Sequence, residues 1–201
     1  MIIGLTGSIA MGKSATSHMF QKLGYPVFDA DSAVHKLYAN GGEAAKQIAA
    51  IYPDVMDDGA VDRKLLAQKI ADDETVLPKI EKMVHPLVGA LEKAFISRHQ
   101  KAGSKLIIMD IPLLFEAGRE GDVDIIVVVS APAALQRQRA LQRPGMTSEK
   151  LDFIIARQLS DKEKRARADY VVKTDKSLEN AFEQVKSIVK ELDPENPDLE
   201  K

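Results

Sequence analysis

The segment from Gly7 to Ser14 reads Gly-Ser-Ile-Ala-Met-Gly-Lys-Ser and fits the spacing G-x-x-x-x-G-K-[ST]. It follows an apolar run, Ile2 to Thr6, and precedes a helical pattern, which is the strand-loop-helix setting that this spacing requires. Two glycines permit a tight loop with inward-pointing amides, and the helix that starts there adds its own amides and the positive end of its dipole. The segment therefore predicts a loop (P-loop) that binds the phosphates of a nucleotide.

Each part of this loop has an expected task. Lys13 can reach the β- and γ-phosphates, and the Ser14 hydroxyl can join the coordination of Mg²⁺. An ordinary glycine-rich turn would need neither the Lys-Ser pair nor this spacing. The residues expected to bind ATP in the loop are Gly7, Ala10, Met11, Gly12, Lys13, Ser14 and Ala15.

Asp110 is a second candidate for the metal. Four apolar residues, Leu106 to Met109, precede it, and in P-loop proteins an acid at the end of such a run lies beside the magnesium water shell. The alternative is an aspartate that caps a turn at the end of a strand. We therefore expect Ser14 and Asp110 to be the metal residues.

Phosphoryl transfer also needs an acceptor hydroxyl and a group that takes its proton. Two carboxylates, Asp29 and Asp31, come at the end of the second apolar run, which begins at Val27. We expect only one of these two carboxylates to face the phosphates. A carboxylate at the carboxyl end of a parallel strand can accept the proton of an attacking hydroxyl. One of the two carboxylates can therefore serve as the base; the alternative is that Asp31 or Ser32 caps the following helix.

An arginine-rich segment over 136–167 is interrupted at Pro144-Gly145 and is predicted to form a mobile helical lid. Arg139 and Arg143 are four residues apart and would share one helical face. Guanidinium groups that close over the γ-phosphoryl oxygens would stabilise their charge. Arg139 and Arg143 are our preferred residues for this, with Arg137 and Arg157 as weaker candidates, and a solvated helix surface is the alternative.

Five apolar, β-branched runs alternate with helical patterns and predict an α/β fold with a central parallel sheet of five strands flanked by helices. Between residues 33 and 100 there is no convincing strand, and helical patterns at 43–51, 63–72 and 74–98 indicate an inserted helical subdomain. The expected parts are a nucleotide-binding core (1–32, 103–135, 168–192), an acceptor-substrate subdomain (33–102), the lid (136–167) and a flexible tail (193–201).

Composition excludes several classes of protein. The formal net charge is -2, so the chain is not built to neutralise nucleic acid or to coat a membrane. There is no cysteine, which excludes disulfides, thiolate nucleophiles and cysteine-ligated metals. The N-terminal apolar run is too short for a signal peptide, and none reaches the roughly 20 residues of a membrane span. We expect a cytoplasmic protein, either a monomer or a small homo-oligomer.

The order of the motifs resembles the dephospho-CoA kinase family over residues 2 to about 190. The matching motifs, in chain order, are Thr6-Gly7 through Lys13-Ser14, Asp29-Ala30-Asp31, His85-Pro86-Leu87, and Ile111 through Glu116 with the sequence Ile-Pro-Leu-Leu-Phe-Glu. The resemblance implies ATP-dependent phosphorylation of the 3'-hydroxyl of dephospho-CoA, with Asp31 as base and with Lys13 and Arg139 as further catalytic residues. It also implies that the acceptor contacts His85, Pro112, Leu113 and Glu116.

Alternatives exist for these motifs. His85 before proline can simply end a helix, and Pro112 to Phe115 can be core packing at the end of the sheet. The loop carries Met11 where the family often has a small serine, and the segment Lys173 to Ser177 lacks the family's Asn/Gly-rich pattern, which leaves the adenine contacts unassigned.

The rival functions are another small-molecule kinase acting on nucleosides or nucleotides, a regulatory GTPase, and a nucleotide-binding scaffold without transfer. The GTPase would need [NT]-K-x-D after a late strand, and here Val172 precedes Lys173-Thr174-Asp175. The helical insertion argues against a nucleoside kinase, and the presence of both Lys13 and Asp31 argues against a scaffold.

Overall fold

The computed structural model describes residues 1 to 200 and divides into two compact units. The first contains Met1–Phe28 and the chain from His99 onward, and the second contains Asp29–Arg98. Among the described residues no helix combines the length and the apolar character needed to cross a membrane.

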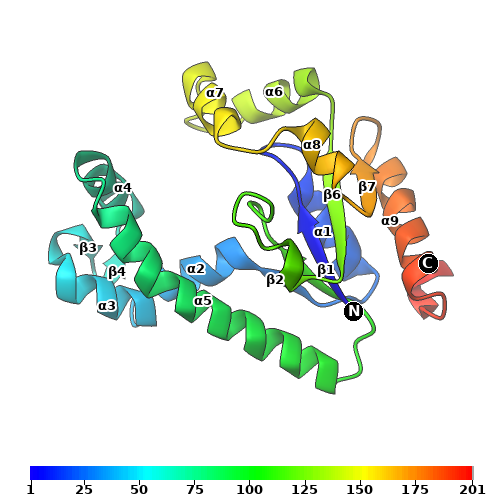
Figure 1. Ribbon diagram of the computed structural model, residues 1–201, viewed down its shortest axis with the longest axis horizontal. Coiled ribbons are helices and arrows are strands. Elements are labelled where there is room, and N and C mark those ends of the chain that lie inside the picture. The colour runs from blue at the N-terminus through cyan, green and yellow to red at the C-terminus, as the bar shows by residue number, and fades with distance from the viewer. Residues whose placement is uncertain (201) are drawn as a thin grey trace. The chain divides into compact units, whose positions relative to one another are not determined.

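A five-stranded sheet forms the centre of the first unit, in the order β2-β5-β1-β6-β7 (Figure 1). Strand β1 pairs in parallel with β5 and β6, and β6 pairs in parallel with β7. The strands are β1 (Ile2–Thr6), β2 (Val27–Asp29), β5 (Ile107–Asp110), β6 (Ile125–Ser130) and β7 (Tyr170–Lys173). The predicted α/β sheet with five strands is confirmed.

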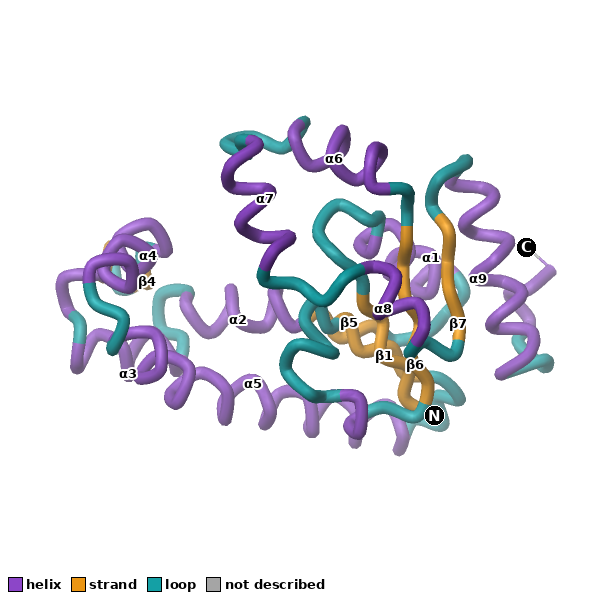
Figure 2. The backbone as a smooth tube through the Cα atoms, turned by 45° about the horizontal axis from the view of Figure 1, so that its top comes forward, coloured by secondary structure: helices purple, strands orange, loops and turns teal. Residues whose placement is uncertain are grey.

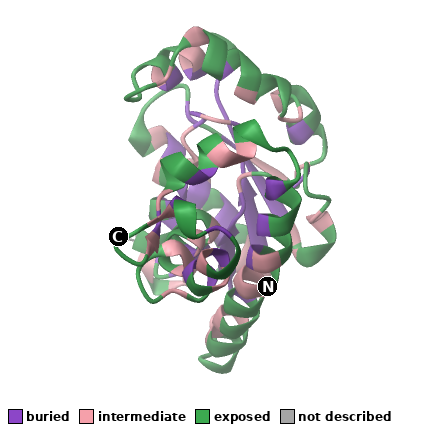
Figure 3. Cartoon of the chain, turned by 90° about the vertical axis from the view of Figure 1, so that its left-hand side faces the viewer, coloured by how far each residue is buried: buried purple, intermediate pink, exposed green. Residues whose placement is uncertain are grey.

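Two helices, α1 (Lys13–Lys22) and α9 (Leu178–Leu192), cover one face of this sheet. Their apolar side chains form a core with Ile3, Leu5 and Val127, each of which has 0% exposure. Burying such a side chain contributes about 1.5 to 3 kcal/mol. The central strands β1, β5 and β6 are almost entirely buried, and Figure 3 shows buried strands in the middle of the sheet. Strands that are covered on both faces are expected to have such largely apolar sequences.

The opposite face of β1 is covered by the segment that follows β5. A Cβ atom at Gly4 would lie 2.6 Å from Leu114 Cδ1, so the absence of a side chain at Gly4 lets this segment approach the strand. The short helix α8 (Asp161–Ala166) packs against β6. These contacts fix the elements that surround the carboxyl ends of the central strands.

The predicted lid segment forms three helices, α6 (Ala133–Leu141), α7 (Ser148–Ala156) and α8, joined by the turns seen in Figure 2. Thr147 caps α7 by accepting the Lys150 N–H at 3.3 Å. Ser160 and Glu163 form a capping box at the start of α8. Caps of this kind satisfy amides that have no partner within the helix, so each of these two helix starts is determined locally.

The second unit is mostly helical and has its own core, which includes Ala44, Ile48, Val55 and Ile80. Its helices are α2 (Ala30–Tyr38), α3 (Glu43–Ile51), the short 3-10 helix η1 (Pro53–Val55), α4 (Arg63–Asp72) and α5 (Val76–Lys101), of which α5 continues beyond the unit.

The second unit also contains a small antiparallel hairpin of β3 (Met56–Asp57) and β4 (Ala60–Val61). The expectation of no strand between residues 33 and 100 is therefore wrong. Both turn residues have positive φ angles, 43° at Asp58 and 76° at Gly59. Asp-Gly is the dipeptide that favours such a tight hairpin turn, but strands of two residues are too short for a period-2 pattern to show.

Pro86 lies inside α5, which continues from Val76 to Lys101. The alternative that His85-Pro86 ends a helix is therefore wrong. Proline removes one backbone N–H and clashes with the preceding turn, and the helix tolerates this because Val84 and Ile80 bury its apolar side in the core of the second unit. His85 itself is exposed.

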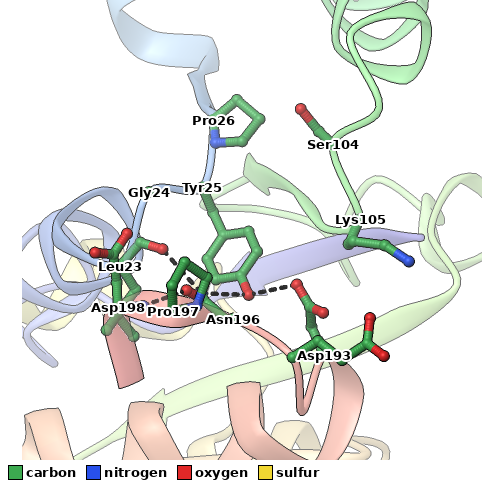
Figure 4. Close-up of a pocket in the computed structure, with 11 residues that line it drawn as sticks. Leu23, Gly24, Tyr25, Pro26, Ser104, Lys105, Asp193, Asn196, Pro197 and Asp198 are labelled. Atoms are coloured by element: carbon green, nitrogen blue, oxygen red, sulfur yellow. Dashed lines mark hydrogen bonds between the residues drawn. The ribbon is translucent and has the colours of Figure 1, made fainter. Parts of the chain in front are cut away.

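The chain after α9 folds back beside Tyr25, at the amino end of β2 (Figure 4). The Tyr25 hydroxyl donates to Asp193 Oδ2 at 2.8 Å, and Asn196 Nδ2 donates to Tyr25 Oη at 2.6 Å. A pocket of about 340 Å³ lies among these residues and Lys105. Burial, together with Asp193, raises the pKa of Tyr25 above its ordinary value. The segment predicted to be a flexible tail thus makes specific side-chain contacts in this structure.

Candidate active site

The loop between β1 and α1 has the backbone that its two glycines predict. Gly12 precedes α1 with a φ of 99°, in the left-handed region that favours glycine. At Gly7, a Cβ atom would lie 2.6 Å from the Val129 carbonyl oxygen, so the loop passes close to β6. Ala10 also has a positive φ of 61°, a strained conformation of the kind found at functional sites. The loop is shaped by close contacts on both sides.

Helix α1 presents its amides at the end of this loop. Within the described residues no side chain caps the helix start, and its first turn contains no acidic residue. The first amides of a helix have no intrahelical partner, and the positive end of the dipole lies there. Lys13 and Ser14 occupy this first turn, so the arrangement suits a phosphate anion.

Lys13 forms an ion pair with Asp110, whose side chain is 5% exposed. The pairing of β1 and β5 places Asp110 opposite Leu5, two residues before Gly7. A lysine held beside the loop by a carboxylate can exchange that partner for a phosphate oxygen. The strand alignment therefore brings the predicted metal residue Asp110 beside the phosphate-binding loop.

The oxygen atoms of Ser14 and Asp110 fit Mg²⁺, which prefers oxygen ligands. The described residues contain no cluster of three His, Cys, Asp or Glu side chains that could hold a metal by themselves. Magnesium in nucleotide sites usually keeps waters and is held by one or two protein groups together with phosphates. Both residues therefore stay predicted metal residues.

Met11 does not obstruct the loop. Its side chain is 2% exposed, and its sulfur accepts the Ala131 N–H at 3.1 Å. The thioether thus packs against the chain that follows β6 and points away from the loop. The departure from the family's small serine is accommodated by this burial.

Two glutamines hold the peptide groups of Ile9. Gln136 of α6 donates through Nε2 to the Ile9 carbonyl at 2.9 Å, and Gln158 Oε1 accepts the Ile9 N–H at 3.0 Å. Both glutamines come from the segment predicted to be the lid. Sequence reasoning missed them, because an amide side chain in a polar helix gives no sign of which backbone group it will meet.

The arginines of the predicted lid have different partners. Arg137 pairs with Asp152 at 2.6 Å and so joins α6 to α7; Asp152 raises the pKa of Arg137. Arg157 stacks on the Phe153 ring at 3.8 Å. Arg139 instead contacts the loop after β7, donating to Thr174. Of these three contacts, only the one between Arg139 and Thr174 involves a residue that itself bonds to the phosphate-binding loop, since the Thr174 hydroxyl donates to the Met11 carbonyl.

The expectation that Arg139 and Arg143 share one helical face is wrong. Helix α6 ends at Leu141, and Arg143 lies in the following turn, where its N–H donates to the Ala140 carbonyl at 3.0 Å. Pro144 disfavours the helical conformation at the residue before it, so the helix ends ahead of Arg143. The role of Arg143 in ATP binding stays a prediction.

The motif that follows β5 has both packed and exposed residues. The Pro112 carbonyl accepts the Thr6 hydroxyl at 3.2 Å, Leu114 and Phe115 are buried, and Leu113 is 47% exposed. The alternative of core packing therefore describes Leu114 and Phe115, whereas Leu113 is free of the core. Acceptor contacts of Pro112 and Leu113 stay predictions.

Glu116 lies 2.8 Å from the ammonium of Lys164, which is completely buried, and its carboxylate accepts the Leu159 N–H at 2.8 Å. The Lys164 contact is an ion pair by distance but is not aligned as a hydrogen bond. Burial alone would raise the pKa of Glu116, but Lys164 and the Leu159 amide outweigh it and hold the pKa below 4.5. Glu116 thereby anchors α8, a structural role that the sequence did not suggest.

Asp29, the last residue of β2, and Asp31, in α2, have different local roles. Asp29 caps α2, since its Oδ1 accepts the Ser32 N–H at 3.0 Å. The cap is therefore Asp29, and the alternative that Asp31 or Ser32 caps the helix is wrong. Asp31 lies exposed in the first turn of α2. Its carboxylate is not needed as the cap and can serve another purpose.

Known proteins of one family match this chain along most of its length. The family model described as dephospho-CoA kinase matches residues 1–180. The chain is 49% identical to a dephospho-CoA kinase of Mesorhizobium japonicum, over 96% of both chains. It is 46% identical to the Rhizobium meliloti enzyme of that name, over 96% of this chain and 98% of the relative.

Solved structures share the fold. A crystal structure of a Thermus thermophilus protein is similar with a TM-score of 0.82 and 32% identity, covering 96% of this chain and 97% of that one. Dephospho-CoA kinase from Campylobacter jejuni has a TM-score of 0.68 at 22% identity, covering 95% and 96%, and supports the fold alone. The resemblance seen in the motifs is confirmed, and the chain belongs to the dephospho-CoA kinase family.

Proposed function

We propose that this protein transfers the γ-phosphoryl group of ATP to the 3'-hydroxyl of dephospho-CoA, giving CoA and ADP. The observation that carries the proposal is the loop from Gly7 to Gly12, with Lys13 and Ser14 in the uncapped first turn of α1. The family membership then selects the acceptor. Cytoplasmic residence and a monomeric or small homo-oligomeric state remain predictions.

In the proposed reaction the bond between the γ-phosphorus and the ADP oxygen breaks, and a bond from the 3'-oxygen to that phosphorus forms. Asp31 accepts the proton of the hydroxyl, since the neighbouring Asp29 is engaged as the helix cap. Lys13 leaves Asp110 to contact the phosphates, and Arg139 stabilises the transferring group. Ser14 and Asp110 would hold Mg²⁺, which supplies neutralisation of phosphate charge when bound.

The test is ADP release from Mg-ATP with dephospho-CoA, compared with no acceptor and with adenosine or AMP as acceptor, and with GTP as donor. We expect stimulation by dephospho-CoA alone. Stimulation by AMP or adenosine instead would assign another small-molecule kinase, and ATP binding without any stimulation would leave a nucleotide-binding scaffold.

The two aspartates provide a matched pair of variants for the base. Asp31→Asn should lower kcat by roughly 10²- to 10⁴-fold, the usual contribution of a general base. Asp29→Asn should retain activity, because asparagine caps a helix about as well as aspartate does. Equal losses in both variants would contradict the assignment of Asp31.

A further inference from the structure

Thr174, in the loop after β7, joins two parts of the first unit. Its hydroxyl donates to the Met11 carbonyl at 2.7 Å, while Arg139 donates to Thr174 Oγ1 at 2.9 Å and to the Thr174 carbonyl at 2.6 Å. The Thr174 N–H donates to the Ser130 carbonyl at 2.9 Å, which continues the pairing of β6 and β7. The residue is 9% exposed and is held on its backbone and on its side chain.

The direction of this chain of hydrogen bonds is fixed by chemistry. A guanidinium group can only donate, a carbonyl oxygen can only accept, and a hydroxyl has one proton to give. The Thr174 proton must therefore point to Met11, with Arg139 donating to the hydroxyl oxygen. Successive hydrogen bonds of this kind polarise one another, so the arginine strengthens the bond that Thr174 makes to the loop.

This bond orients one peptide group of the phosphate-binding loop. The peptide between Met11 and Gly12 is planar and trans, so its C=O and N–H point in opposite directions. Because the Met11 carbonyl is held toward Thr174, the Gly12 N–H points away from Thr174. A Cβ atom at Gly12 would lie 3.1 Å from the Thr174 side chain, so the two residues lie side by side.

We propose that Thr174 is a positioning residue for the phosphates of a nucleoside di- or triphosphate. Its hydroxyl holds the Met11 carbonyl toward Thr174 and thereby turns the Gly12 amide to the other side. Because Gly12 directly precedes Lys13, which is expected to reach the β- and γ-phosphates, this amide would meet a phosphate beyond the α-phosphate. The inference rests on the proposed function only in that the loop binds a nucleotide. The identity of the acceptor does not enter it.

The test compares the dissociation constants of ADP and AMP for purified full-length protein, measured by titration calorimetry in Mg²⁺ without acceptor. Thr174→Val removes the hydroxyl with almost no change of shape, and Thr174→Ser keeps the hydroxyl. We expect the ratio of the AMP to the ADP dissociation constant to fall about tenfold in Thr174→Val, equal to about 1.4 kcal/mol, and to stay within about twofold of wild type in Thr174→Ser.

Other outcomes would overturn the inference. A residue with a merely structural role would lower the unfolding temperature and leave the ratio unchanged. An adenine contact would weaken ADP and AMP equally, which also leaves the ratio unchanged. A fall of the ratio in both variants would mean that the shape of the Thr174 side chain matters and not its hydroxyl. A wild-type protein that binds AMP as tightly as ADP would show that the loop makes no contact that favours a second phosphate, which would also overturn the inference. Thr174→Ala, measured in the same way, replaces the valine variant if that one does not fold.

These results are independent of the acceptor assignment. An unchanged ratio together with dephospho-CoA turnover would overturn the role of Thr174 and keep the kinase proposal. A changed ratio without acceptor-stimulated turnover would support the role of Thr174 and overturn the kinase proposal.

Discussion

Replacing Glu116 with glutamine would leave the ammonium of Lys164 buried without its counter-ion, while the shape of the site is almost unchanged. Lys164 is 0% exposed, and the Glu116 side chain is 16% exposed. Removing one partner of a buried ion pair costs about 3 to 5 kcal/mol.

We therefore expect Glu116→Gln to lower the free energy of unfolding by about 3 to 5 kcal/mol at pH 7. For a chain of 201 residues, a loss of 3 kcal/mol corresponds to a fall in Tm of roughly 6 to 12 °C. The double variant Glu116→Gln with Lys164→Met removes both charges and should recover much of the loss, because an apolar replacement of a buried pair is often neutral.

The pH dependence gives the sharper test. The pKa of Glu116 lies below its ordinary 4.5, so its contribution is present above pH 4.5 and is lost as the pH falls through the lowered value. The difference between wild type and variant should therefore be full at neutral pH and shrink as the pH falls below 4.5.

The assay is urea unfolding followed by far-UV circular dichroism, from pH 3 to pH 9, for wild type and both variants. A difference below about 1 kcal/mol at pH 7, the range of an exposed ion pair, would refute the reasoning. A difference that does not change with pH would also refute it, because packing and not charge would then be its cause.

Tyr25→Phe should lower the free energy of unfolding by about 1 to 2 kcal/mol through loss of the hydrogen bonds to Asp193 and Asn196. Because the folded-state pKa of Tyr25 is raised, this contribution is fully present below pH 10 and should shrink as the pH rises further; a constant difference in urea unfolding between pH 8 and pH 11 would argue against it. Gly4→Ala should cost about 1 to 3 kcal/mol by overpacking against a buried leucine, measured as a fall in Tm, and an unchanged Tm would show that the leucine yields freely. Pro86→Ala should stabilise the second unit by about 1 to 3 kcal/mol, because alanine restores a helical N–H at an exposed position; slower amide exchange in α5 would confirm this, and faster exchange would contradict it.

The sequence determined what depends on local pattern. The spacing from Gly7 to Ser14 predicts a phosphate-binding loop because close approach and positive φ angles require glycine at particular positions. Continuous apolar runs predict strands covered on both faces. The helical patterns at 43–51 and 63–72 match α3 and α4 to the residue, because apolar periodicity and, for α4, the Asp62 cap act within a few residues of each other.

Tertiary structure decided which partner each polar side chain has. The Arg139 contact with Thr174 and the burial of Lys164 were not predictable from the sequence. A lysine in a charged segment looks the same whether it is solvated or buried, since its environment comes from residues far away in the chain. Thr174 meets Met11 across 163 positions, and only the folded sheet brings them together. The motifs thus follow from spacing, whereas the groups that orient them depend on the fold.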